Sequence, residues 1–140
     1  MSELSPAAVV DTMMEKDLFS QWLGIQVEEV EKGYCRCRLE VREEMLNGFR
    51  IAHGGIAYAL ADSVLAFAAN SNGRMAVSIE TSISHYLPCS NGDQLTAESE
   101  CTHLGGRMAY YLVHIVNQEG QKVALFKGTV FRKKELWSRD

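Results

Sequence analysis

The first part of the chain carries apolar residues at helical spacing. Ser5 followed by Pro6 is a typical helix start, with Ser as the N-cap and Pro as the first helical residue. The pattern predicts a helix over residues 6–19. Four residues form its apolar face: Val9, Val10, Met13 and Met14.

The most apolar stretch lies in the middle of the chain and predicts a longer helix over residues 55–72. Gly73 suits the left-handed C′ position that ends many helices. Because this helix is apolar all round, it needs burial on every side. Its most apolar part, Ile56–Ala69, is shorter than the ~18–20 residues of a membrane span and carries Asp62 in its middle, so no membrane partner is expected.

Strand-like segments occupy most of the remaining chain. They cover residues 25–31, 34–41, 77–87, 95–102, 108–116 and 123–131. Glycine-containing pairs, such as Lys32-Gly33, Asn91-Gly92 and Glu119-Gly120, supply turns between them. A curved antiparallel sheet wrapped around one long central helix would bury that helix, which predicts an α+β fold in a single domain, residues 1–140.

Charge and cysteine content exclude several classes of function. The net charge is −4, and the one basic cluster, Arg132-Lys133-Lys134, is short, so no nucleic-acid partner is expected. The four cysteines include no CxxC pair, and the histidines include no HxxxH, so no metal site is expected. No signal peptide is indicated, and free thiols favour a reducing, cytoplasmic location.

The start of the long helix is one candidate functional site. Gly54 and Gly55 have no side chains to cover the first backbone N–H groups of the helix. These donors and the helix dipole can stabilise an oxyanion. The alternative is that the two glycines only allow close packing.

Asp62 is the second candidate, because it lies among apolar residues of the long helix. A carboxylate there costs stability, and aspartate is rarely buried without a partner, which favours a catalytic role. The alternative is a hydrogen-bonding aspartate that fixes a dimer interface.

Two polar residues precede the helix. Asn47 lies on a loop that can fold back over the helix start, where its amide can donate to a carbonyl or accept from a water. Asn47-Gly48 is also a common turn. His53 could act as a base, but next to two glycines a structural role in shaping the loop is favoured.

Together these motifs resemble those of the hotdog-fold thioesterases, most of all the phenylacetate-degradation (PaaI-like) type. The resemblance covers nearly the whole chain and rests on four motifs: Leu46-Asn47-Gly48, His53-Gly54-Gly55, Leu60-Ala61-Asp62 and Gly92-Asp93-Gln94-Leu95. It implies a homotetramer of hotdog dimers that hydrolyses aryl- or acyl-CoA thioesters without a metal or cofactor.

The resemblance also implies roles for individual residues. Asp62 matches the nucleophile or general base of the family, Gly54 the oxyanion-hole amide, and Asn47 the polar residue beside the thioester. Two positions depart from relatives: Ala66 replaces a hydroxyl residue, and Leu87 replaces an arginine before the proline. Without that arginine, Arg107 is the candidate for the CoA phosphates, and Gly55 is a further candidate for substrate contact.

Two other functions compete with thioester hydrolysis. One is a hotdog-type dehydratase or hydratase with His53 as base, which leaves Asp62 without a role. The other is a non-catalytic acyl-CoA sensor, which has no need of Asp62.

The spacing of Gly54 and Asp62 predicts a shared active site. Eight residues along one helix separate them by about 12 Å and turn them about 80° apart. Since both must lie about 3 Å from the reacting group, one helix cannot supply both to one carbonyl. We therefore expect each active site to lie between two subunits of a two-fold dimer.

Overall fold

The N-terminal segment forms two helices instead of the single predicted one. In this computed structural model, which describes residues 3–138, helix α1 covers Pro6–Lys16 and helix α2 covers Leu18–Leu23. Ser5 caps α1 as predicted, and its hydroxyl accepts from Ala8 N at 3.1 Å. The chain leaves helical geometry at Asp17, whose carboxylate accepts from Ser20 N and caps α2. The prediction of one helix over residues 6–19 was wrong because Asp17 starts a new helix.

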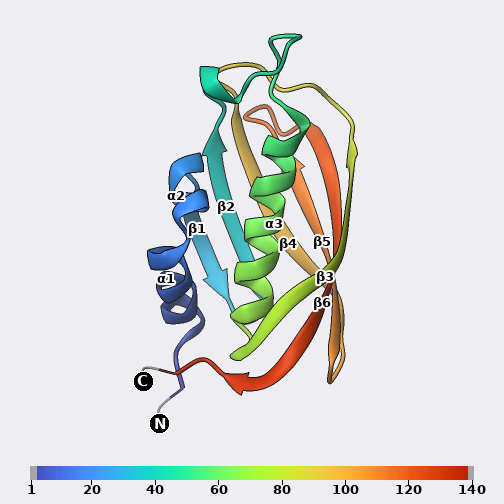
Figure 1. Ribbon diagram of the computed structural model, residues 1–140. Helices are drawn as coiled ribbons and strands as arrows, with labels where there is room; N and C mark the ends of the chain where they lie inside the picture. Colours follow the sequence, from blue (N-terminus) through green and yellow to red (C-terminus); the bar gives the residue numbers. More distant parts are fainter. Residues whose placement is uncertain (1–2, 139–140) are drawn as a thin grey trace.

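Six antiparallel strands form one curved sheet in the order β1-β2-β4-β5-β6-β3 (Figure 1). The strands are β1 Gln26–Glu31, β2 Tyr34–Glu40, β3 Arg74–His85, β4 Gln94–Leu104, β5 Met108–Val116 and β6 Lys122–Leu136. Each predicted strand segment corresponds to one of them, with shifted ends. Strands β1 and β3 are the two edges of the sheet, and β3 lies next to β6, far from it in sequence.

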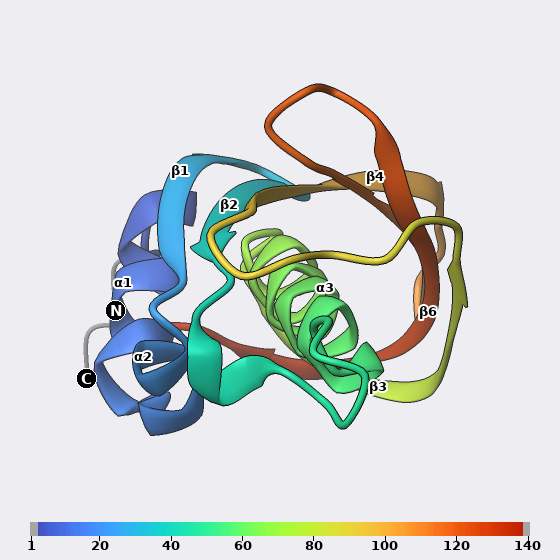
Figure 2. The same ribbon diagram turned by 90° about the horizontal axis from the view of Figure 1, so that it is seen from above.

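The long helix α3, Gly54–Asn70, lies in the concave face of the sheet, as Figure 2 shows from above. The approach is close at Gly128 on β6, where an added Cβ would meet Leu65 Cδ2 at 2.5 Å. This arrangement confirms the predicted α+β hotdog architecture. The helix ends earlier than predicted: Ser71 is the C-cap, and Gly73, with φ 107°, makes the turn two residues later.

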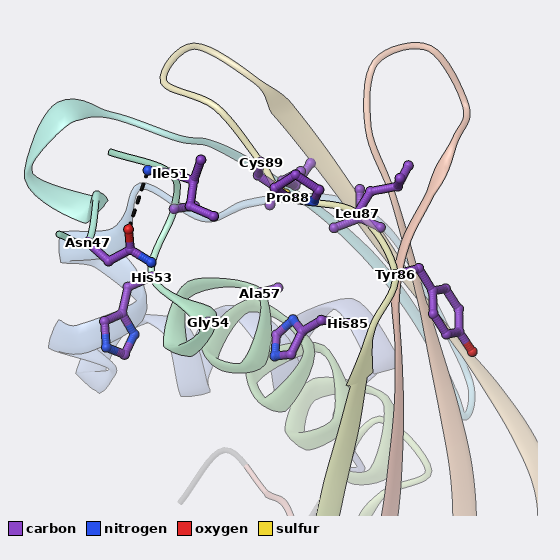
Figure 3. Close-up of a pocket in the computed structure, with 13 residues that line it drawn as sticks. Asn47, Ile51, His53, Gly54, Ala57, His85, Tyr86, Leu87, Pro88 and Cys89 are labelled. Atoms are coloured by element: carbon purple, nitrogen blue, oxygen red, sulfur yellow. Dashed lines mark hydrogen bonds between the residues drawn. The ribbon is translucent and has the colours of Figure 1, made fainter. Parts of the chain in front are cut away.

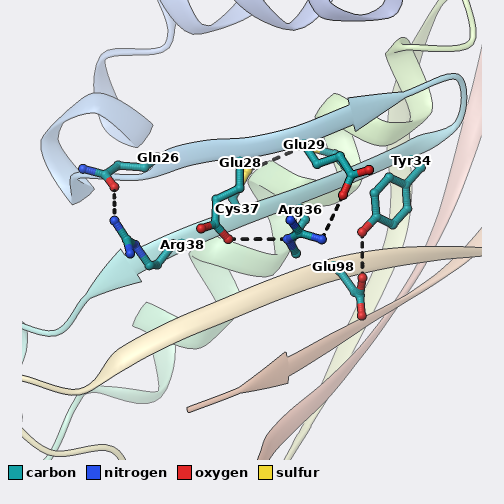
Figure 4. A network of polar contacts seen from close by, with 9 residues as sticks. Gln26, Glu28, Glu29, Tyr34, Arg36, Cys37, Arg38 and Glu98 are labelled. Atoms are coloured by element: carbon teal, nitrogen blue, oxygen red, sulfur yellow. Dashed lines mark hydrogen bonds and ion pairs between the residues drawn. The ribbon is translucent and has the colours of Figure 1, made fainter. Parts of the chain in front are cut away.

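The outer face of the sheet at β1 and β2 is polar and solvated. Along β2, the inward residues Cys35, Cys37 and Leu39 are buried, whereas Arg36 and Arg38 point outward. Figure 4 shows the outward groups paired with neighbours: Arg36 Nη1 lies 2.9 Å from Glu29 Oε2, and Arg38 Nη2 2.6 Å from Gln26 Oε1. This alternation is typical of an antiparallel sheet with one face on the core.

One face of α3 is not covered by the sheet, contrary to the expectation of burial on every side. Residues at intervals of three and four positions line an open cavity of about 420 Å³ beside α2: Gly55, Tyr58, Ala59, Asp62, Ser63 and Ala66. The opposite face, with Leu60, Ala61 and Val64, is fully buried. Within residues 3–138, no helix has the length and hydrophobicity needed to cross a bilayer.

Candidate active site

The loop before α3 is held in place by backbone hydrogen bonds. Ala52 N donates to Cys89 O at 2.8 Å, and His53 N donates to Met45 O at 2.8 Å. Near its tip, Asn47 N donates to Ile51 O at 2.8 Å, and Arg50 takes a left-handed conformation with φ 61°. These bonds fix the direction from which the chain enters the helix.

The first turn of α3 leaves one backbone donor free. His53 is the N-cap, and its Nδ1 accepts from Gly55 N at 2.9 Å. The Gly54 N–H has no hydrogen-bond partner within residues 3–138. The Gly55 amide is therefore occupied, and Gly54 presents the free N–H at the positive end of the helix dipole.

Gly54 lines a cavity of about 330 Å³, shown in Figure 3. Its walls come from the loop, the start of α3 and the segment after β3. The polar lining includes Asn47, His53 and His85, and the apolar lining includes Ile51, Ala57, Tyr86, Leu87, Pro88, Cys89, Leu95 and Val123. The cavity therefore offers an apolar compartment next to an anion-stabilising donor.

Asn47 uses only half of its amide within the loop. Its Oδ1 accepts from Phe49 N at 2.9 Å and from Ile51 N at 3.4 Å. The Nδ2 group has no partner among residues 3–138, and Asn47 lines the cavity. The acceptor that the sequence suggested for a water is thus occupied, and the donor remains.

Asp62 lies on a different face of α3, in the open cavity beside α2. Its carboxylate is half-buried, and no group within residues 3–138 donates a hydrogen bond to it. Burial, followed by the negative charge of Asp17, raises the pKa of Asp62 above its ordinary value. An unpartnered carboxylate with a raised pKa is well suited to act as a base or nucleophile.

The structure separates the predicted residues into three groups. Asn47, His53 and Gly54 line the cavity at the start of α3, and Gly55 and Asp62 line the cavity beside α2. Arg107 lies in neither. It belongs to the β4–β5 turn, at the opposite end of the sheet from the start of α3 (Figure 1).

Three residues in these cavities were not found from the sequence. His85, at the end of β3, packs against Gly54: its Nε2 would lie 3.4 Å from a Cβ added there. Asp17 lies beside Asp62 across the helices, and no local motif marked either contact. Cys89 lines the first cavity, but burial, with a smaller effect of Asp93, raises the pKa of its thiol to about 11, which disfavours the thiolate.

The structure has a long helix held in a curved antiparallel sheet. The helix has a free N–H at its start and a carboxylate about two turns later, and these features are typical of a hotdog-type hydrolase. Comparison with known proteins agrees with this class. Residues 49–124 match the Thioesterase superfamily model. The chain belongs to the thioesterase superfamily.

Relatives at the sequence and structural levels are of the same kind. An Archaeoglobus fulgidus protein named a putative esterase is 37% identical over 91% of this chain and 82% of its own length. Acyl-coenzyme A thioesterase PaaI of Escherichia coli is 38% identical over 86% of both chains. The structure of E. coli PaaI matches with a TM-score of 0.92 over 95% of this chain and 96% of its own.

A Streptococcus pneumoniae protein described as a hypothetical thioesterase was solved with coenzyme A. It is 28% identical and matches with a TM-score of 0.77 over 81% of this chain and 88% of its own.

Proposed function

We propose that this protein hydrolyses acyl-CoA thioesters to the free acid and CoA, with Asp62 as nucleophile or general base and the Gly54 amide as oxyanion donor. One observation carries the assignment of these two residues. A free helix-start N–H and a half-buried carboxylate without a donor lie on two faces of one helix. The E. coli and S. pneumoniae relatives support the choice of CoA thioesters.

The chemistry follows from these two groups. The thioester carbonyl oxygen accepts from Gly54 N–H, which stabilises the negative charge formed on attack; one such donor is typically worth about 3–4 kcal/mol. Asp62 either attacks the carbonyl carbon or deprotonates a water that attacks it. The C–S bond then breaks, and the CoA thiolate leaves and takes up a proton. On the direct route a water then hydrolyses the anhydride between Asp62 and the acyl group, which releases the free acid; on the general-base route the acid forms when the C–S bond breaks. Oxygen-18 appearing in Asp62 after a single turnover in labelled water would support direct attack.

The edge strand β3 supports a dimer. Val77 and Ile79 on this strand are 47% and 59% exposed, although both are large and apolar. An exposed apolar edge strand is a template for pairing with another chain. We propose that β3 pairs antiparallel with β3 of a second subunit.

This pairing would create the shared active site. A two-fold axis at β3 makes the two α3 helices antiparallel, so the start of one approaches the open face of the other. That face carries Asp62. Asp62 also lines a second cavity, whose walls include Ala76, Val77 and Ser78 of β3. Gly54 and Asn47 of one subunit would then act with Asp62 of the other. Pairing of two such dimers would give the tetramer that the family resemblance implies.

We further propose an aryl group, such as phenylacetyl, as the acyl part of the substrate. The cavity next to Gly54 has a mostly apolar lining. Its volume of about 330 Å³ suits a single ring and its linker. The name of the E. coli relative, which belongs to a phenylacetic acid degradation operon, supports this choice.

Arg107 remains our candidate for the CoA phosphates, acting on the active site of the other subunit. Its guanidinium is exposed and has no partner within residues 3–138, and its turn is held by Arg132, whose Nη1 donates to Gly105 O at 2.6 Å. Arg107 lines a cavity at this end of the sheet together with Lys133 and Lys134. Antiparallel pairing at β3 would bring this end of the sheet to the side of the partner where α3 begins.

A thiol-release assay with a panel of aryl- and alkyl-CoA thioesters tests the proposed function. We expect release without an added metal or cofactor, and faster turnover of aryl substrates. A dehydratase would change the acyl chain without releasing thiol, and a sensor would bind the ligand without turnover; either result would contradict the proposal. We also propose a cytoplasmic location, which the free thiols of all four cysteines support.

A further inference from the structure

A chain of hydrogen bonds links α2 to α3 beside Asp62. The Ser20 hydroxyl donates to Asp17 Oδ2 at 2.6 Å and lies 2.7 Å from the Ser63 hydroxyl. Ser20 is 1% exposed, so this link is protected from water. Ser63 follows Asp62 directly, and Asp17, Asp62 and Ser63 line the same cavity.

The direction of each hydrogen bond is fixed by the donors available. A carboxylate only accepts, so the single hydroxyl proton of Ser20 goes to Asp17. The proton between the two serines must therefore come from Ser63. The Ser63 hydroxyl is thus committed to Ser20, and the two hydrogen bonds hold Asp17 against α3.

Asp17 is also the only charged side chain besides Asp62 that lines the two cavities in which Asp62 lies. Tyr58 of α3 is the only other titratable group there. The lining residues from α1, β3 and β6 are uncharged: Met13, Ala76, Val77, Ser78 and Val130. None of the residues that these elements contribute to the cavity lining carries a positive charge beside Asp17.

We propose that Asp17 is a positioning residue for Asp62: held against α3 through Ser20 and Ser63, it places a negative charge beside the Asp62 carboxylate and makes that carboxylate a stronger base. This inference rests on the proposed role of Asp62. The negative charge of Asp17 shifts the pKa of Asp62 upward, which agrees with this role. A stronger base removes a proton from water more readily, so the charge of Asp17 beside Asp62 favours catalysis near neutral pH.

Asp17→Asn tests this inference without removing the cap of α2, because Asn is as good an N-cap as Asp. The variant removes the charge. When its Oδ1 caps the helix, its amide NH2 faces the Ser20 hydroxyl and donates to it. That reverses the two hydrogen bonds of this link without adding a donor to Asp62. Loss of the Asp17 charge lowers the pKa of Asp62.

The acid limb of kcat/KM against pH should therefore move to lower pH in Asp17→Asn, and the plateau should fall by less than about tenfold, since the Asp62 carboxylate is still present. Asp11→Asn is the matched control: it removes an exposed carboxylate of α1 that lines neither cavity, and its profile should match the wild type. A lower plateau with an unmoved acid limb would show a purely structural role and overturn the inference.

A second measurement does not depend on turnover. Carbon-13 NMR titration of the Asp62 carboxyl, assigned by comparison with Asp62→Asn, should give a lower midpoint in Asp17→Asn than in the wild type. Equal midpoints in the two folded proteins would overturn the inference. If the wild type releases no thiol but the midpoints differ, the proposed function fails and the effect of Asp17 on Asp62 stands.

Discussion

Gly54 and Asp62 belong to the same helix but line two different cavities. Gly54 opens onto the cavity formed by the preceding loop and the segment after β3. Asp62 opens onto the face of α3 beside α2. One chain therefore holds both groups of the proposed chemistry and cannot direct them at one carbonyl, which makes a dimer a requirement of that proposal.

Asp62→Asn should lower kcat by at least about 100-fold, because the amide is close in size but cannot act as a base or nucleophile. The measurement is thiol release at saturating substrate, with circular dichroism to confirm the fold. A variant that keeps more than about a tenth of wild-type kcat, a loss of less than ~1.4 kcal/mol, would show that Asp62 is not central.

The same substitution should stabilise the fold at neutral pH. The pKa of Asp62 is raised in the folded state, so the folded state binds the proton more tightly than the unfolded chain. Stability then falls as pH rises from the ordinary value of 3.8 through the folded-state pKa, and the cost is fully present above it. We expect Asp62→Asn to have a higher Tm than the wild type at pH 7, with the difference narrowing toward pH 4. A lower Tm at pH 7 would indicate that Asp62 has a stabilising partner.

Gly54→Pro should abolish most activity while preserving the fold. Proline lacks the N–H, and that N–H makes no hydrogen bond among the described residues, 3–138. Proline is tolerated at the first helical position, and His53 already has the extended φ −56° and ψ 139° that a following proline requires.

Gly54→Ala is the matched control for the proline variant. It keeps the N–H, and its Cβ would lie 3.4 Å from His85 Nε2, which is an acceptable contact. Thiol release should therefore survive in the alanine variant and be lost in the proline variant. Equal activity in the two would assign Gly54 to packing.

Asn47→Asp and Asn47→Ala separate the two halves of the Asn47 amide. Aspartate keeps an acceptor for Phe49 N and Ile51 N, so its Tm should stay near that of the wild type, whereas alanine loses both loop bonds and about 1 kcal/mol for each. Both lose the free Nδ2 donor, and both should lose activity, though less than Asp62→Asn does. Wild-type kcat in the aspartate variant would exclude Nδ2 from the reaction.

Local sequence signals predicted the fold and most of its elements. Pro6, the apolar run around Asp62 and the glycine turns each act over a few residues, so they can be interpreted without knowing distant contacts. The break at Asp17 was missed because its carboxylate caps α2 through Ser20 while the apolar spacing continues. The early end of α3 was missed because Asn70 Oδ1 accepts from Ala76 N and Trp137 Nε1, and the second of these comes from the far end of the chain.

The candidate site was predictable in part for the same reason. Gly54 and Asp62 were found because an uncovered helix start and an apolar-flanked carboxylate are local features. Asp17 and His85 reach the two cavities from other elements, so only the folded chain shows them. The occupied oxygen of Asn47 likewise depends on how the loop turns back on itself.

The shared active site is tested most directly by mixing two inactive variants, Asp62→Asn and Gly54→Pro. In a mixed dimer one site carries both substitutions, and the other has an intact Gly54 and an intact Asp62. Co-refolded mixtures that form heterodimers should therefore release thiol from an acyl-CoA substrate, although each variant alone does not. Heterodimers that form and remain as inactive as the separate variants would contradict the shared site.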